Sequence, residues 1–176
     1  MKPFLLFSLL FLSTIMNAQK VNLVKNGGFE RDIANWRGDV ATISPYDKKS
    51  GKNGALINQY TGTEWKGIDQ IVIIPRNTYA VEFNVWIKTE SIEGGKEPYN
   101  AGVMIVEFTD NGEKKISSEP IAQLTGTTDW TNYKKNVKIP ADAQKIRIML
   151  ALAQTSGSIY FDDVKAMPLS EEEYSK

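Results

Sequence analysis

Residues 79–88 read Tyr-Ala-Val-Glu-Phe-Asn-Val-Trp-Ile-Lys, and this stretch decides the fold class. Tyr79 and every second residue after it are apolar, whereas most of the residues between them are polar. Successive side chains of a strand point to opposite faces, so this alternation predicts a β-strand with one buried face. Residues 145–152, Lys-Ile-Arg-Ile-Met-Leu-Ala-Leu, repeat the pattern late in the chain.

Shorter stretches of the same kind continue on both sides of these two strands. Glycine- and asparagine-containing turns separate them, and no stretch has a convincing helical period. About ten short strands with regular turns predict an all-β protein, a two-sheet antiparallel β-sandwich of the jelly-roll type. The other expected strands are 22–24, 40–43, 55–60, 68–73, 103–108, 114–117, 132–139 and 158–166.

The composition excludes several classes of function. The 176 residues contain 21 Lys and Arg against 21 Asp and Glu, so no net positive charge favours nucleic acid. The chain has neither Cys nor His, which excludes the common catalytic triads, thiol chemistry and the usual zinc sites. A metal here must be a hard cation bound by oxygen. Glycosidases need paired carboxylates, and the spacing of Glu64, Glu82 and Glu107 nominates no pair, so we expect no enzyme.

The N-terminus resembles a secretory signal in its layout. Lys2 precedes an apolar run over residues 4–16, and Ala18 offers a small residue for cleavage. The run is shorter than the roughly 20 residues of a membrane-spanning helix. We therefore expect a signal peptide at 1–18 and a secreted or periplasmic protein without membrane insertion, although a buried helix would share the pattern. One domain follows at 19–168, with a disordered acidic tail at 169–176.

Several residues have the chemistry of sugar recognition. Trp86 shares a strand face with Glu82 and Asn84, and an indole among polar groups can stack on the apolar face of a sugar. The same arrangement also occurs where a loop covers the indole, and the sequence leaves both interpretations open. Trp65 lies in a turn-rich polar stretch, which favours ligand contact. The remaining candidates are Arg147, Tyr60 and Tyr99, whereas Trp36 and Trp130 have the pattern of packing residues. We expect one shallow cleft in which Trp65 and Trp86 are the platforms and Arg147, Glu82 and Asn84 supply hydrogen bonds.

Two acidic positions at opposite ends of the chain suggest a cation site. Glu30 follows the Gly-rich turn that contains Gly28, and Asp162 lies in the last expected strand. The termini of sandwiches often lie close together, and calcium takes six to eight oxygens from carboxylates and carbonyls. Ordinary solvation of surface carboxylates is the alternative.

Six segments occur in the order typical of a known family. They are 22–30 (Asn-Leu-Val-Lys-Asn-Gly-Gly-Phe-Glu) with Trp36, 54–56, 64–68, 78–88, 127–130 with 139–143, and 157–164. Together they resemble the carbohydrate-binding modules of families 4, 9 and 22, over residues 21–167. The resemblance implies a galactose-binding-like β-jelly roll that binds polysaccharide or oligosaccharide chains without catalysis, in a system with glycan-degrading enzymes. A structural or adhesive surface protein that contacts other proteins is the alternative.

The resemblance also implies roles for particular residues. The indole of Trp65 would stack on a sugar ring, and Arg147 would form hydrogen bonds with the sugar. Family members often have a polar residue in the segment matching 151–153, where this chain has Ala-Leu-Ala, so the usual glycan specificity is in doubt. A structural calcium ion would join the first and last strands. Its ligands would be the Gly28 carbonyl, Glu30, Asp162 and carbonyls near Gly51 and Gly54.

Overall fold

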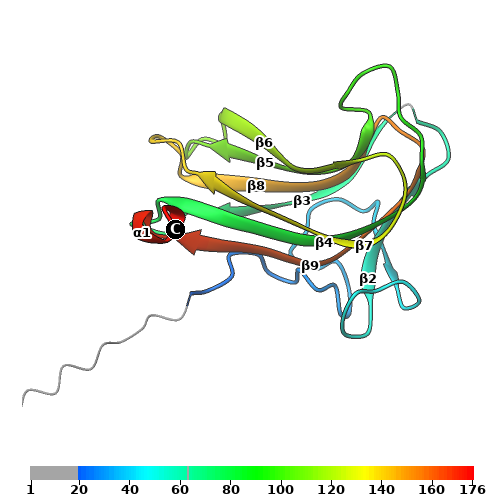
Figure 1. Ribbon diagram of the computed structural model, residues 1–176, viewed down its shortest axis with the longest axis horizontal. Helices are drawn as coiled ribbons and strands as arrows, with labels where there is room; N and C mark the ends of the chain where they lie inside the picture. The colour runs from blue at the N-terminus through cyan, green and yellow to red at the C-terminus, as the bar shows by residue number, and fades with distance from the viewer. Residues whose placement is uncertain (1–19, 63) are drawn as a thin grey trace, which may run out of the picture.

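The structure is a computed structural model that describes residues 20–62 and 64–176, so the expected signal peptide lies outside the described residues. Antiparallel strands dominate the described residues and form two stacked layers (Figure 1). The elements are β1 Thr42–Ser44, β2 Gly54–Gln59, β3 Trp65–Ile73, β4 Ala80–Ile92, β5 Ala101–Thr109, β6 Lys115–Leu124, β7 Gly126–Lys138, β8 Lys145–Ala153, β9 Gly157–Leu169 and the short helix α1 Glu171–Tyr174.

The two layers are a five-stranded and a four-stranded sheet. The strand order is β1-β2-β9-β4-β7 in the first sheet and β3-β8-β5-β6 in the second. The pairings are antiparallel, and several neighbours in the sheets are distant in sequence, such as β2 with β9 and β3 with β8. The predicted all-β, two-sheet antiparallel sandwich is confirmed.

The core lies between the sheets and is built from the alternation read in the sequence. On β4, Val81, Phe83, Val85 and Ile87 are fully buried, and the residues between them face outward. The matching apolar residues 146, 148, 150 and 152 of β8 are also fully buried. Each such side chain contributes about 1.5–3 kcal/mol by leaving water, so these two strands stabilise the sandwich strongly.

The first segment differs from the prediction, because residues 22–24 form no strand. The Asn22 side-chain oxygen accepts hydrogen bonds from the backbone of Val24 at 3.1 Å and of Ala166 at 2.8 Å. Leu23 contributes one backbone bond to the Ala166 carbonyl. An asparagine side chain thus replaces part of the ladder that a strand would make with β9.

Strands β6 and β7 are much longer than the sequence predicted. Both are edge strands, and most residues of β7 are exposed or only half-buried. Polar residues therefore occupy both faces of these strands, which removes the alternation that would reveal them.

The acidic tail is not irregular throughout, because residues 171–174 form one helical turn. Ser170 caps it: its hydroxyl accepts from the Glu173 backbone, and the Glu173 carboxylate accepts from the Ser170 backbone. Lys20 forms an ion pair with Glu173 at 2.5 Å and, with the Ser170 backbone, lowers the pKa of that carboxyl to about 2. A capping box and the ion pair with Lys20 thus stabilise one helical turn in a segment whose composition predicted disorder. No helix in the described ranges is long and apolar enough to cross a membrane.

Candidate functional site

The outer face of the four-stranded sheet carries two of the predicted ligand-binding residues, Trp65 on β3 and Arg147 on β8. We call this surface the four-strand face. Its rows are set by the antiparallel register, in which directly opposite residues point to the same side. From β3 through β8 to β5, the rows are Trp65–Ala153–Ala101, Gly67–Ala151–Val103, Asp69–Met149–Ile105 and Ile71–Arg147–Glu107.

An exposed indole over small buried residues marks one end of the four-strand face. Trp65 is 48% exposed, whereas the alanines of its row, Ala101 and Ala153, are each 1% exposed. The β4–β5 connection is fastened to this end: the Gln123 side chain donates to the Pro98 carbonyl, and Asn100 donates to the Ala153 carbonyl at 3.5 Å. Figure 1 shows the β2–β3 and β4–β5 connections at the same end of the sandwich. Trp65 therefore stands beside a loop anchored to the sheet.

Alternating charges from two neighbouring rows, that of Asp69 and that of Arg147, cross the other half of the four-strand face, and we call them the charged row. The Asp69 carboxylate accepts from Arg147 at 2.9 Å and forms an ion pair with Arg37 at 2.5 Å. Glu107 lies 3.8 Å from the Arg147 guanidinium and 3.6 Å from the Lys115 ammonium. The hydrogen bond to Asp69 raises the pKa of Arg147. Each cation has an acidic neighbour, so the row presents fixed donors and acceptors side by side.

Sequence reasoning missed Arg37, Asp69 and Glu107 as members of this surface. Arg37 lies outside any named strand and reaches the sheet through a backbone bridge to Asp69. One signal was available, because Asp69 is four residues after Trp65 and shares its face if both lie on one strand. The contacts with Arg37 and Arg147 depend on pairings that the local sequence does not encode.

Three other predicted ligand residues lie on the opposite side of the sandwich. Trp86, Glu82 and Asn84 are on β4, in the five-stranded sheet. The Lys49 ammonium lies 4.0 Å from the Trp86 ring centroid. Glu82 pairs with Lys134 at 2.6 Å, and the amide of Asn84 bonds that of Asn132 at 3.2 Å.

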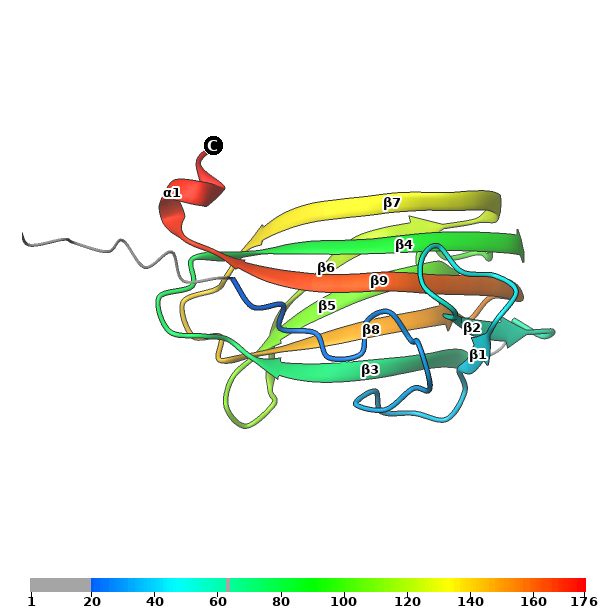
Figure 2. The same ribbon diagram turned by 90° about the horizontal axis from the view of Figure 1, so that it is seen from below.

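Trp86 therefore fits the interpretation of an indole beneath a loop. Figure 2 shows the connection between β1 and β2 lying over the five-stranded sheet. The prediction that Trp65 and Trp86 serve one cleft with Glu82, Asn84 and Arg147 is wrong in its grouping, because the core separates the two faces. Alternation shows that a residue points outward, but not to which sheet its strand belongs.

The two candidate tyrosines lie in different connections. Tyr99 is 53% exposed and lies in the β4–β5 loop, two residues before β5 of the four-stranded sheet. Tyr60 is 91% exposed and directly follows β2 of the five-stranded sheet. Tyr99 therefore belongs to the Trp65 end of the four-strand face, whereas Tyr60 begins the turn that leads from the other sheet to Trp65.

The residues of the expected cation site do come together. The backbone amide of Val164 donates to the carbonyl of Gly27 at 2.9 Å, which joins the first turn to β9. A Cβ on Gly51 would lie 1.7 Å from a carboxylate oxygen of Glu30, so the glycine leaves the space that this oxygen occupies. Asp162 is fully buried and accepts from the backbones of Lys49 at 2.8 Å and Ser50 at 2.9 Å.

The cluster brings two carboxylates to one connection, and carboxylate oxygens are ligands of hard cations. Glu30 and Asp162 reach the same connection, residues 45–53, from opposite ends of the chain, and Gly28 and Gly54 flank them. Burial raises the pKa of Asp162, while hydrogen bonds from three backbone amides oppose that shift. No group of three or more carboxylates gathers among the described residues, so a cation here would need backbone carbonyls as well.

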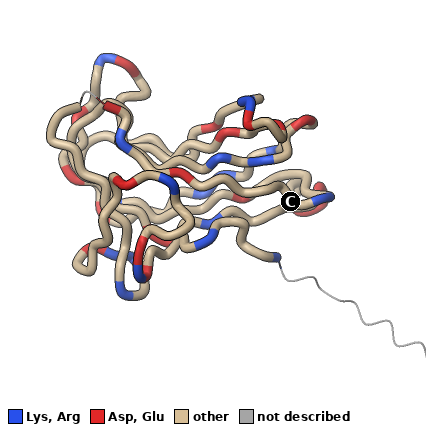
Figure 3. Tube along the Cα trace, turned by 180° about the vertical axis from the view of Figure 1, so that it is seen from behind, with Lys and Arg blue, Asp and Glu red and all other residues tan. Residues whose placement is uncertain are grey.

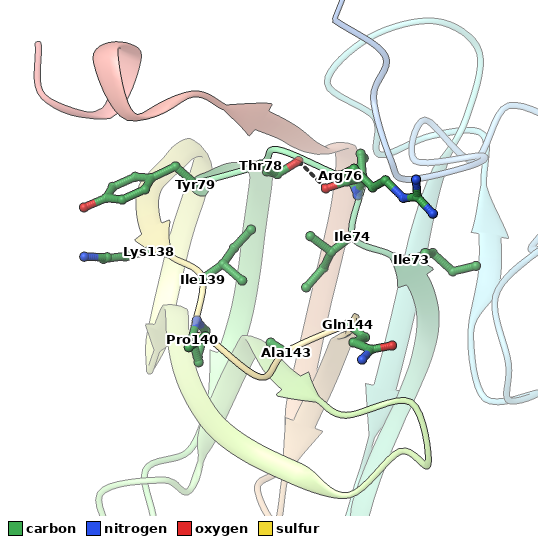
Figure 4. A pocket seen from close by; sticks show the side chains of 12 residues that line it. Ile73, Ile74, Arg76, Thr78, Tyr79, Lys138, Ile139, Pro140, Ala143 and Gln144 are labelled. Carbon is green, nitrogen blue, oxygen red and sulfur yellow. Dashed lines mark hydrogen bonds between the residues drawn. The ribbon is translucent and has the colours of Figure 1, made fainter.

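Another hollow in the described residues lies elsewhere. It encloses about 660 Å³ between the β3–β4 and β7–β8 connections. Figure 4 shows Ile74 and Ile139 facing each other across it, with Arg76 and Lys138 at its two sides. The backbone bond from Ile74 to the Gln144 carbonyl, at 3.0 Å, joins the two connections. This hollow lies at one end of the core, and none of the predicted ligand residues lines it.

Comparison with known families decides what this arrangement is. The family model CBM_4_9, described as a carbohydrate binding domain, matches residues 21–157. This chain belongs to that carbohydrate-binding family. The match covers the sandwich from the N-terminal turn to the start of β9, including Trp65, Asp69 and Arg147. The resemblance read from the sequence is confirmed, and the protein is a carbohydrate-binding module. No curated protein matches it.

Solved structures similar to this module have its fold at low sequence identity. The CBM22-1 xylan-binding domain of Paenibacillus barcinonensis Xyn10C has a TM-score of 0.60 and 16% identity, covering 86% of this chain and 96% of that one. TmCBM61, in complex with β-1,4-galactotriose, has a TM-score of 0.54 and 21% identity, covering 85% and 99%.

A third similar structure belongs to a much larger protein. It is the enzymatically active domain of bacteriophage CBA120 tailspike protein 4, with a TM-score of 0.62 and 19% identity. The match covers 84% of this module but only 21% of the tailspike chain. The likeness therefore concerns the sandwich alone.

Proposed function

We propose that this module binds polysaccharide or oligosaccharide chains on the four-strand face, without catalysis. One observation carries the proposal: a half-exposed Trp65 lies on the same face as the row of Arg37, Asp69, Arg147 and Glu107. The indole supplies an apolar platform for a sugar ring, and the charged row supplies directed hydrogen bonds to hydroxyls. The similar domain that is described as xylan-binding and the galactotriose complex support this class of ligand.

The two parts of the face set a minimum length for the ligand. Trp65 and Asp69 are four residues apart on β3, which corresponds to roughly 13 Å along the strand. This span exceeds one sugar ring, so a chain segment can engage the indole and the charged row together. The buried floor of Ala101, Ala151 and Ala153 offers no polar side chain, so specificity must come from the row and from the anchored loop.

Affinity electrophoresis tests this function directly. The protein is run through native gels that contain xylan, mixed-linkage glucan, laminarin, alginate or pectin, with a plain gel as reference. We expect retardation in at least one of the five gels and no release of reducing ends. Unretarded passage through all five would contradict glycan binding and favour a structural or adhesive role through protein contacts. Release of sugars would contradict the non-catalytic part of the proposal.

Replacing Asp69 with Asn is expected to weaken binding to the retarding glycan about three- to tenfold. The carboxylate holds Arg37 and Arg147 in place, and charge-assisted hydrogen bonds of this kind are worth about 1.5–3 kcal/mol each. The matched control is Glu82→Gln, which breaks an ion pair on the opposite sheet and should leave affinity unchanged. Equal affinities of the two variants in titration calorimetry would remove Asp69 from the site.

We further propose that a structural calcium ion stabilises the module. Glu30 and Asp162 would hold it together with carbonyls at Gly28, Gly51 and Gly54. Bound calcium would supply positive charge between two carboxylates that belong to opposite ends of the chain. It would thereby tie the N-terminal turn to β9 and to the connection before β2.

Removal of calcium is expected to lower the melting temperature of the wild-type protein by about 5–10 °C. A ligand present at a hundredfold excess over its dissociation constant adds about 2.7 kcal/mol to the free energy of unfolding. For a module of this size, each kcal/mol shifts the melting temperature by about 2–4 °C. Glu30→Ala should melt low and ignore EGTA, whereas Glu113→Ala, which changes an exposed carboxylate elsewhere, should respond like wild type. If EGTA does not change the melting temperature of the wild-type protein, the calcium proposal is contradicted.

We also propose that the protein is exported, with cleavage after Ala18. The positively charged start and the apolar run of residues 4–16 support this. N-terminal sequencing of protein recovered outside the cytoplasm should begin at Gln19. An uncleaved N-terminus on cytoplasmic protein would contradict export.

A further inference from the structure

A second hollow lies at the end of the five-stranded sheet, beside the β2–β3, β4–β5 and β8–β9 connections. It encloses about 340 Å³ at the ends of β2, β4 and β9, three strands of the five-stranded sheet. Among the described residues, its lining contains one aromatic ring, two carboxylates and three serine hydroxyls, with no Lys or Arg. These residues are Gln59, Tyr60, Glu90, Ser91, Glu93, Ser156, Gly157 and Ser158.

The aromatic ring of this hollow is almost completely exposed to solvent. Tyr60 is 91% exposed at the rim. A large aromatic side chain gains little for folding in that position, because it removes almost no apolar surface from water. The ring is instead available as a platform, and aromatic rings with a polar tip suit ligands that have one apolar and one polar side.

The polar groups of the hollow are held in place by the strands behind them. Glu90 accepts from the Tyr160 hydroxyl at 3.1 Å and pairs with Lys88 at 2.9 Å. Burial, followed by the bond to Glu90, raises the pKa of Tyr160 to about 12, so the phenol remains a donor over the ordinary pH range. The carboxylate of Glu90 thus keeps one orientation beside Tyr60.

The floor of the hollow depends on two unusual backbone conformations. Ser91 has a φ of 50° and Gly157 a φ of 120°. A Cβ on Gly157 would lie 2.7 Å from the Ser91 carbonyl oxygen, so only glycine allows β9 to approach β4 this closely. The Ser91 amide donates to Thr127 on β7 at 2.9 Å, which holds the left-handed residue. The hollow is therefore formed by the closely packed ends of interior strands of the sheet.

We propose that this hollow is a second carbohydrate site, which takes one neutral sugar residue at a chain end or branch. The apolar face of the sugar would stack on the ring of Tyr60. Oxygens of Glu90, Glu93 and Ser158 would accept hydrogen bonds from the sugar hydroxyls. The volume is near the lower end of the range for small-molecule sites, about 300–1,000 Å³, so one ring fits rather than a chain. Two lining carboxylates repel a uronate. The inference rests on the proposed function, since it assigns a second site for the same ligand class.

The number of sites per molecule tests the proposal. Xylotriose, cellotriose, laminaritriose and β-1,4-galactotriose are titrated into wild type and variants by calorimetry, with trigalacturonate as the anionic comparison. For the neutral sugar that binds, we expect two sites in wild type, one in Tyr60→Ala, one in Trp65→Ala and none in the double variant. Tyr46→Ala is the matched control, because Tyr46 is also 91% exposed but lies outside the hollow. It should keep two sites.

The outcomes separate this site from the four-strand face. A single site in wild type that Trp65→Ala removes would overturn the second site and leave the proposed function standing. Two sites that Tyr60→Ala does not reduce, or tighter binding of trigalacturonate than of every neutral trisaccharide, would also overturn it. Absence of binding by all five probes would overturn both. Melting curves of the two tyrosine variants should match wild type, because neither ring is packed.

Discussion

Replacement of Asp162 by Ala is expected to lower the free energy of unfolding by roughly 3–5 kcal/mol. The Asp162 side chain is fully buried, and its carboxylate accepts from the backbones of Lys49, Ser50 and Asp163 at 2.8, 2.9 and 2.7 Å. Hydrogen bonds to charged groups are worth about 1.5–3 kcal/mol each, and alanine leaves the two amides of the 45–53 connection without an acceptor. Urea unfolding followed by tryptophan fluorescence measures the loss.

Two further variants show whether the anchoring itself is responsible. Asp162→Asn keeps the shape and one acceptor oxygen, so its loss should be about half that of Ala. Asp39→Ala removes an exposed carboxylate and should change stability by less than about 0.5 kcal/mol. The measurements are made in EGTA, so that any calcium effect is removed. Equal midpoints for Asp162→Ala and Asp39→Ala would contradict the anchoring role.

Replacement of Trp65 by Ala is expected to reduce glycan affinity by tenfold or more, with a small change in melting temperature. The indole is 48% exposed, so its truncation removes little from the core. As the aromatic platform at the end of the four-strand face, it supplies contact area that the small residues Ala101 and Ala153 cannot replace. A tenfold loss corresponds to about 1.4 kcal/mol, which is within the range of a central aromatic contact.

The control for this variant is Trp86→Ala on the other sheet. Trp86 lies beneath Lys49, so its removal should lower stability while leaving glycan retention in the gel intact. We therefore expect opposite results for the two tryptophan variants: Trp65→Ala should lose binding, and Trp86→Ala should lose stability. Unchanged retention of Trp65→Ala would show that the four-strand face is not the binding surface.

The strongly alternating strands could be read from the sequence. Residues 79–88 and 145–152 each form a strand with one buried face, because burial of every second side chain is a local property of the chain. The edge strand β7 was underestimated, since its two faces are both partly solvated and the alternation is lost. The helical turn at 171–174 was missed because its cap and its ion pair with Lys20 outweigh an acidic, polar composition.

The sequence by itself determined the all-β class, the family and the outward-pointing aromatic residues. Only the tertiary structure decided that Trp65 and Trp86 lie on opposite sides of the sandwich, since β3 and β4 are consecutive in sequence but belong to different sheets. It also decided that Asp69 lies between Arg37 and Arg147, which are 32 and 78 residues away. A strand encodes which of its faces is buried, whereas its neighbours are selected by packing of the whole chain, and a binding surface is built from neighbours.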